Sequence, residues 1–227
     1  DFPAKKKVRI VNALHRFNLL VTSYDRYTRL LRPTIQEVAA RYQRPARLLE
    51  LGSGSGEFPL ELARRSEEKQ LPVEVTGSDY LPEYVEHGNM RARQEGVNVR
   101  FRLVNAFDMQ DLGPDAYDII LISQSMHHFS PGQIAMMLAQ AKTVATTAFV
   151  GIDGYRGLLF FASVPALTWL LCWQPFILHD TILSGCRAYS EYELELMARI
   201  AVPDTTISVN ELFPGVSVLT ARFDEIN

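Results

Sequence analysis

Residues 47–56 read Arg47-Leu48-Leu49-Glu50-Leu51-Gly52-Ser53-Gly54-Ser55-Gly56. A short apolar run that ends in alternating glycines predicts a buried strand and a tight turn into a helix. A dinucleotide fingerprint would need a third glycine at position 57, which is Glu57, and the lysine of a phosphate-binding loop is absent. An acid beside this turn would repel a pyrophosphate, whereas it suits a ligand that carries an ammonium group.

On either side of the turn, apolar runs alternate with amphipathic segments. Five runs have the length and composition of buried strands, namely 47–51, 73–77, 99–104, 117–122 and 148–152. Three segments between them are typical of helices, namely 58–69, 82–95 and 131–145. Such alternation predicts βαβ units, and therefore a parallel sheet with helices on both faces.

The C-terminal part departs from this alternation. Ser190 and Glu193 form a capping-box pattern at the start of an acidic amphipathic helix over 190–201. Residues 205–209 and 216–223 read as two strands around a turn at 213–215. The expected fold is therefore of the α/β class, a doubly wound, mostly parallel sheet of seven strands with a C-terminal antiparallel hairpin.

The N-terminal forty residues have helical spacing of apolar side chains, with Pro33 expected as an early residue of a helix over 34–42. A length of 227 residues fits one domain with an insertion. We therefore expect a helical segment over residues 1–45 and one domain over 46–227, interrupted by a helical insertion at 156–187.

Composition excludes several classes of protein. Hydrophobic residues make up 47% and charged residues 22%, which is ordinary for a globular chain. The net charge of −3 argues against a nucleic-acid partner, which usually selects a basic surface. Two cysteines, Cys172 and Cys186, cannot build a disulfide framework or a zinc site alone, and no secretory signal is evident. A cytoplasmic location is expected, and the basic cluster 5–9 is read as a solvated helix start rather than a lipid-binding patch.

The insertion contains an uncharged run of twenty-one residues, 158–178, which is long enough to span a bilayer. Pro165 and Pro175 divide it, and a span would separate two parts of one sheet fold. We therefore predict no transmembrane helix. The run, which includes Phe161 and Trp169, is instead interpreted as a lid over an apolar pocket. A buried helix pair, peripheral contact with a membrane and a homodimer through the insertion remain alternatives.

Polar side chains follow the other predicted strands at the same edge of the sheet. Asp79 could accept two hydrogen bonds from ribose hydroxyls, and Asn105-Ala106-Phe107 offers an amide, a backbone N–H and an aromatic face to an adenine. Gln124, His127 and His128 follow the fourth strand. Structural alternatives are a helix cap at Asp79, a loop with one buried phenylalanine, and a capping histidine.

In this ordered set of motifs, the chain resembles the class I S-adenosylmethionine-dependent methyltransferases over residues 47–152, a family with a Rossmann-like fold. The resemblance implies S-adenosylmethionine as the cofactor. It assigns the methionine part to Glu50, Gly52, Ser53, Gly54 and Gly56, the ribose to Asp79, the adenine to Tyr80, Leu81, Asn105, Ala106 and Phe107, and the sulfonium and amino groups to Gln124.

Two departures from the family are visible. Asn105 stands where an aspartate is frequent, and Ala145-Thr146-Thr147 occupies the usual Pro-Gly-Gly turn before the fifth strand. The signature of amino-directed DNA methyltransferases is absent. The stretch 179–190 resembles enzymes that methylate quinones, polyketides and other secondary metabolites.

The expected activity is O- or C-methylation of a hydrophobic, aromatic small molecule. An acidic acceptor is helped by a base, and histidine titrates in the right range. His127 and His128 are the first candidates and His179 the second, with no metal required. The alternatives are a protein methyltransferase and an inactive cofactor-binding or partner-binding module.

Overall fold

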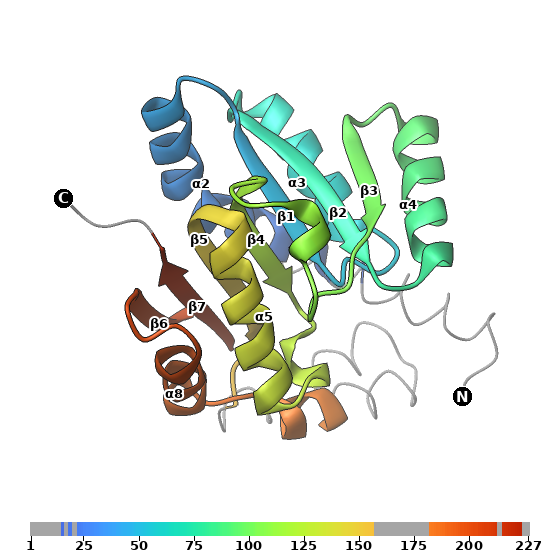
Figure 1. Cartoon of the computed structure of the whole chain (residues 1–227). Helices are drawn as coiled ribbons and strands as arrows, with labels where there is room; N and C mark the ends of the chain where they lie inside the picture. The colour runs from blue at the N-terminus through green and yellow to red at the C-terminus, as the bar shows by residue number, and fades with distance from the viewer. Residues whose placement is uncertain (1–14, 16–17, 20–21, 157–181, 213–214, 224–227) are drawn as a thin grey trace.

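The computed structural model describes residues 15, 18–19, 22–156, 182–212 and 215–223. Its centre is a seven-stranded sheet in the order β3-β2-β1-β4-β5-β7-β6 (Figure 1). The strands are β1 (Ala46–Leu51), β2 (Val73–Asp79), β3 (Val99–Leu103), β4 (Tyr117–Ser123), β5 (Ala145–Gly154), β6 (Thr206–Leu212) and β7 (Val216–Arg222). The first five run parallel, and β7 pairs antiparallel with both β5 and β6. The predicted α/β class, strand number and terminal hairpin are confirmed.

Helices cover both faces of the sheet. On one face, α2 (Ser23–Tyr42), α3 (Glu57–Glu68) and α4 (Pro82–Glu95) supply apolar side chains to one core. On the other, α5 (Pro131–Val144) and α8 (Glu191–Ala201) supply a second core. The residues 119–122 of β4 are fully buried between the two cores, which explains their unbroken apolar sequence. Two 3₁₀ turns, η1 (Gln110–Leu112) and η2 (Met126–His128), flank β4 along the chain.

Two local expectations were wrong. Helix α2 begins at Ser23, so Pro33 lies inside it rather than near its start, at an exposed position. Ala145-Thr146-Thr147 is not a turn. The backbone becomes extended at Ala145, and α5 passes directly into β5. The capping box at Ser190 and Glu193 is confirmed, because the Ser190 hydroxyl accepts from the Glu193 amide while the Glu193 carboxylate accepts from the Ser190 amide.

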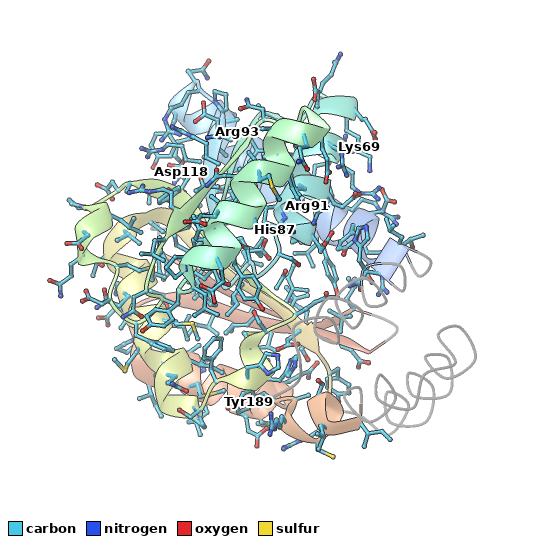
Figure 2. All side chains as sticks on the ribbon, turned by 90° about the vertical axis from the view of Figure 1, so that its right-hand side faces the viewer. Lys69, His87, Arg91, Arg93, Asp118 and Tyr189 are labelled. Atoms are coloured by element: carbon cyan, nitrogen blue, oxygen red, sulfur yellow. The ribbon has the colours of Figure 1, made fainter. Side chains whose placement is uncertain are left out.

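A buried carboxylate joins three elements at the amino ends of β1 and β4. Asp118 is fully buried and accepts two hydrogen bonds from Arg44, at 2.6 and 2.9 Å. It also accepts from the backbone and guanidinium of Arg47 and from the Thr146 hydroxyl. Burial alone would raise the pKa of Asp118, but these donors outweigh it and hold the pKa well below its usual range. Figure 2 shows Asp118 at the opposite end of the molecule from Tyr189, whose hydroxyl donates to the Phe129 carbonyl beyond η2.

Within the described ranges, no helix is both long and apolar enough to cross a membrane. The run 158–178, and with it the predicted lid, lies outside the described residues.

Candidate functional site

The glycine turn between β1 and α3 has the backbone shape that its sequence predicts. Gly52, Gly54 and Gly56 have φ angles of +60°, +53° and +83°, a region that other residues rarely adopt. The Ser53 amide donates to the Ser78 carbonyl at 2.7 Å, which ties the turn to the neighbouring strand β2. A side chain at Gly56 would also meet the ring of Phe101 at 2.5 Å. The turn therefore holds a fixed, tightly curved backbone at the carboxyl edge of the sheet.

A cavity of about 860 Å³ opens at this edge, beside the ends of β1, β2 and β4. Most residues predicted to contact the cofactor line it: Glu50, Gly52, Ser53, Gly54, Asp79, Tyr80, Leu81, Asn105, Ala106, Phe107 and Gln124. His128 lines it as well, whereas Gly56 and His127 are not among its walls. Thus residues from four separate strand ends meet around one space, as the order of motifs predicts for a parallel sheet.

Glu50 provides the most distinctive charge in the cavity. Its side chain is only 2% exposed, and one carboxylate oxygen accepts a short hydrogen bond from the Ser123 hydroxyl. The other oxygen, Oε2, is buried and has no hydrogen-bond partner within the described structure. Burial raises the pKa of Glu50 to about 8. A buried, unsatisfied acid at a cavity wall fits a ligand that brings its own cation.

Asp79 is the last residue of β2 and connects two sides of the cavity. Its Oδ2 accepts from the Gly54 amide at 2.9 Å and its Oδ1 from the Leu81 amide at 3.0 Å. Each carboxylate oxygen can accept a further hydrogen bond, so the pair can still receive two ligand hydroxyls. Asn105 uses its side-chain oxygen to accept from the Phe107 amide, which leaves its NH₂ group for a ligand. Tyr80, the residue after Asp79, is exposed and also lines the cavity.

The two adjacent histidines have different surroundings. The Nδ1 atom of His127 lies 2.9 and 3.0 Å from the Asp153 oxygens, and its backbone amide donates to Asp153 Oδ2 at 2.7 Å. This pairing anchors η2 to the end of β5. The His128 ring, 4.1 Å from that of His127 between centroids, faces the cavity. The geometry thus favours His128 over His127 for contact with a ligand, while His179 lies outside the described residues.

The N-terminal segment supplies cavity residues that the sequence did not reveal. Asn18 and Gln124 exchange two hydrogen bonds through their amides, at 2.9 and 2.8 Å, and Gln124 also donates to the Tyr27 hydroxyl at 3.1 Å. Gln124 adopts a left-handed φ of +53°, a strained conformation that such partners stabilise. His15 and Tyr24 join Asn18 in the cavity wall. No local motif marks these positions, because each contact joins residues far apart in sequence.

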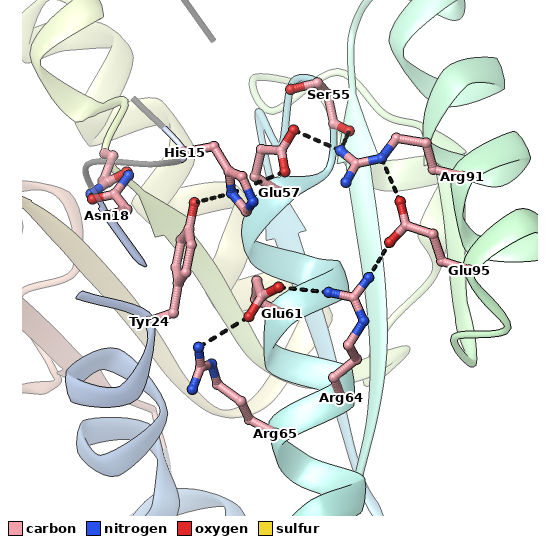
Figure 3. A network of polar contacts seen from close by, with 11 residues as sticks. His15, Asn18, Tyr24, Ser55, Glu57, Glu61, Arg64, Arg65, Arg91 and Glu95 are labelled. Atoms are coloured by element: carbon pink, nitrogen blue, oxygen red, sulfur yellow. Dashed lines mark hydrogen bonds and ion pairs between the residues drawn. The ribbon is translucent and has the colours of Figure 1, made fainter. Parts of the chain in front are cut away.

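Figure 3 shows a chain of charged groups behind the glycine turn. Glu57, at the start of α3, lies 3.2 Å from His15 and 2.6 Å from Arg91 of α4. Arg91 also donates to the Ser55 carbonyl at 3.3 Å, within the turn itself. The chain continues through residues that all lie on α3 and α4, namely Glu95, Arg64, Glu61 and Arg65. The turn is therefore held between two helices and the N-terminal segment.

Among the described residues, no three His, Cys, Asp or Glu side chains lie close enough together to hold a metal ion.

The part of the chain that lines most of this cavity is similar to known proteins. Residues 48–147 match the protein family described as a methyltransferase domain. Residues 48–147 are thus similar to a methyltransferase domain, which supports the resemblance to the class I S-adenosylmethionine-dependent methyltransferases. The match begins inside β1 and ends in β5, so it includes the glycine turn, Asp79, Asn105 and Gln124.

Two curated relatives of this chain are named ubiquinone biosynthesis O-methyltransferases. A ubiquinone biosynthesis O-methyltransferase from Mesorhizobium japonicum is 31% identical over 115 residues, which is 51% of this chain and 43% of that protein. A second, from Rhizobium leguminosarum, is 26% identical over 163 residues, 69% of this chain and 62% of that protein. The chain thus spans less than two thirds of the length of either relative.

The fold has solved counterparts. The crystal structure of an S-adenosylmethionine-dependent methyltransferase from Aquifex aeolicus superposes with a TM-score of 0.57 at 19% identity, covering 79% of this chain and 82% of that one. The agreement concerns the fold.

Proposed function

We propose that this protein transfers a methyl group from S-adenosylmethionine to an apolar, aromatic small molecule of the quinone or polyketide kind. The observation that carries the proposal is a single cavity whose wall combines two kinds of residue. Glu50, the glycine turn, Asp79 and Asn105 would complement an ammonium group, a ribose and an adenine. The remaining wall residues that we assign to the acceptor are Asn18, Tyr24, Gln124, His128 and Phe129.

Different residues would bind the different parts of the cofactor. Glu50, once ionised, would pair with the ammonium of the methionine part, which would lie against the glycine turn. Asp79 would accept both ribose hydroxyls. When bound, S-adenosylmethionine supplies an electrophilic methyl group on a sulfonium. The protein then has to hold the acceptor in line with that methyl group, and such positioning supplies much of the rate enhancement.

The acceptor side suits a molecule with few polar groups. Tyr24 and Phe129 present aromatic surface, and the Asn18–Gln124 amide pair offers hydrogen bonds to one polar substituent. Burial raises the pKa of Tyr24, so its hydroxyl stays neutral near pH 7. The names of the curated relatives favour a quinone precursor as the acceptor. Whether oxygen or carbon receives the methyl group depends on which acceptor atom His128 can deprotonate.

We also make proposals about the insertion, the cellular location and the N-terminal segment. We expect the insertion 156–187, with Phe161 and Trp169, to close the acceptor side as a lid. We also propose that the protein acts in the cytoplasm and that the N-terminal segment 1–45 belongs functionally to the cavity, as Asn18 suggests. A protein substrate is the second candidate, and labelled-cofactor assays on small molecules and on protein extracts distinguish the two.

The first test concerns the ribose contact. Asp79→Ala removes the acceptor of two ligand hydrogen bonds, so we expect the affinity for S-adenosylhomocysteine to fall by about 2–3 kcal/mol, or roughly 30- to 160-fold. Titration calorimetry measures this directly, with Asp204→Ala, an exposed aspartate after α8, as the matched control. Unchanged affinity in Asp79→Ala would remove Asp79 from the cofactor site.

The second test separates the two histidines. His128→Gln should lower kcat by about a hundredfold or more, as expected for loss of a general base, with little effect on cofactor affinity. His127→Gln should chiefly lower the melting temperature, because it breaks the contact with Asp153 that anchors η2. Turnover and thermal denaturation of both variants are compared from pH 5 to 9. If His128→Gln keeps full turnover throughout, the acceptor needs no base from this residue.

A further inference from the structure

Helix α8 carries an apolar stripe on its outer face. Tyr192, Leu196 and Ile200 follow one another at intervals of four residues and are 87%, 59% and 69% exposed. Residues four apart lie on the same side of a helix, so the three side chains form one continuous strip. The opposite face of α8 is buried against the core that α5 shares, through Leu194 and Ala198. The strip is therefore additional to the apolar surface that the fold itself requires.

An acidic and a basic residue lie along one edge of this stripe. Glu195 and Arg199 lie on the same edge of it, one turn apart, and form an ion pair at 2.7 Å. Both remain well exposed, at 42% and 61% of the side chain. An exposed i,i+4 pair contributes little to a single helix, so its partners can be exchanged at small cost.

We propose that α8 is the contact surface between two copies of this chain, packed antiparallel across a two-fold axis near Leu196. In that arrangement Leu196 meets the partner's Leu196, and Tyr192 meets the partner's Ile200. An antiparallel two-fold brings identical edges of the two helices together, so Glu195 approaches the partner's Arg199 and the reverse. The stripe and its charges are thus complementary to themselves, which an isologous interface requires.

The charge on α8 disfavours a membrane as the occupant. Glu191, Glu193 and Glu195 outnumber the one cation, Arg199, along this helix, whereas interfacial helices usually carry lysine and arginine on their polar side. Two helix faces form a contact near the lower end of specific interfaces, so the dimer should depend on protein concentration. This surface differs from the insertion 156–187, and the proposal does not rely on the identity of the substrate.

Sedimentation velocity across a range of protein concentrations tests the proposal with charge variants. Glu195→Arg or Arg199→Glu alone places like charges opposite each other and should raise the dimer dissociation constant about tenfold or more. The double variant Glu195→Arg/Arg199→Glu should restore it. Leu196→Glu should leave a monomer, while Met90→Glu, at an exposed methionine on α4, should change nothing.

Cross-linking locates the axis independently. In a background with Cys172→Ser and Cys186→Ser, Leu196→Cys should form a disulfide with its own copy under mild oxidation. Tyr192→Cys should cross-link more with Ile200→Cys than with itself, and Met90→Cys should not cross-link. A monomer at every concentration, or a dimer that none of the α8 variants weakens, would overturn the proposal. So would flotation with neutral or anionic vesicles that Leu196→Glu abolishes.

Discussion

Glu50→Gln is expected to weaken binding of S-adenosylhomocysteine by about 3–5 kcal/mol near pH 8, a loss of roughly a hundredfold or more. The reason is burial. Glu50 is 2% exposed and its Oε2 has no hydrogen-bond partner among the described residues, so a ligand ammonium would enter a site where water cannot replace a lost carboxylate. The amide of the variant keeps the shape and the contact with Ser123 but removes the charge.

The same burial makes cofactor binding pH-dependent. With a pKa of about 8, Glu50 carries a proton at pH 7 in the free protein, and pairing with a cation requires that proton to leave. Affinity should therefore rise by up to tenfold per pH unit between about pH 6 and 8. Near pH 7, calorimetry in two buffers with different ionisation enthalpies should show proton release on binding. Exposed Glu86 supplies the control, Glu86→Gln.

The stability of the free protein should change with pH in the opposite direction to its cofactor affinity. The folded-state pKa of Glu50 lies above its unfolded value, so the free protein loses stability as pH rises from about 4.5 to 8. Glu50→Gln should therefore raise the melting temperature of the free protein more at pH 8.5 than at pH 5. Equal affinity in wild type and variant, with no pH dependence in either, would contradict the assignment of Glu50 as the ammonium ligand.

Asp118→Ala is expected to have the largest effect on stability, about 3–4 kcal/mol. It leaves Arg44, Arg47 and Thr146 facing a fully buried position without their shared acceptor. The effect is placed toward the lower end of the range for buried pairs because both arginines remain about a third exposed. For a chain of this length, such a change should lower the melting temperature by about 10 °C.

The pH dependence of this effect follows from the lowered pKa of Asp118. A carboxylate whose folded pKa lies below its unfolded value stabilises the fold above about pH 4 and loses that contribution as the solution becomes more acidic. The destabilisation by Asp118→Ala should therefore be full at pH 7 and shrink below about pH 4. Thermal denaturation at several pH values measures it, with exposed Asp111→Ala as the control. An unchanged melting temperature at pH 7 would show that the arginines find equivalent partners without Asp118.

The sequence was most informative where the functional residues are close together in the chain. The glycine turn follows β1 directly, Asp79 is the last residue of β2, and Asn105 comes two residues after β3. Parallel strands place their carboxyl ends at one edge of the sheet. The capping box at the start of α8 is equally local. These features could be predicted because the residues that define them are neighbours in the chain.

Contacts between distant segments could not be predicted in the same way. Asn18 and Gln124 are 106 positions apart, and His127 finds Asp153 26 positions later. The sequence therefore did not distinguish His127 from His128, although only His128 lines the cavity. Asp118 reads as one polar residue in an apolar strand, and its role emerges only when β1 and β4 lie side by side. Pro33 was predicted near the start of a helix, but it lies inside α2 at an exposed position.

An assay with labelled cofactor tests methyl transfer at this cavity. The protein is incubated with S-adenosylmethionine labelled in the methyl group and with a panel of apolar hydroquinones, catechols and phenolic polyketides. We expect label in an organic-extractable product from at least one aromatic acceptor, with loss of that transfer in Asp79→Ala and in His128→Gln but not in Asp204→Ala. Tight binding of the cofactor without label on any small molecule, or label appearing only on protein, would contradict methyl transfer to a small molecule at this cavity.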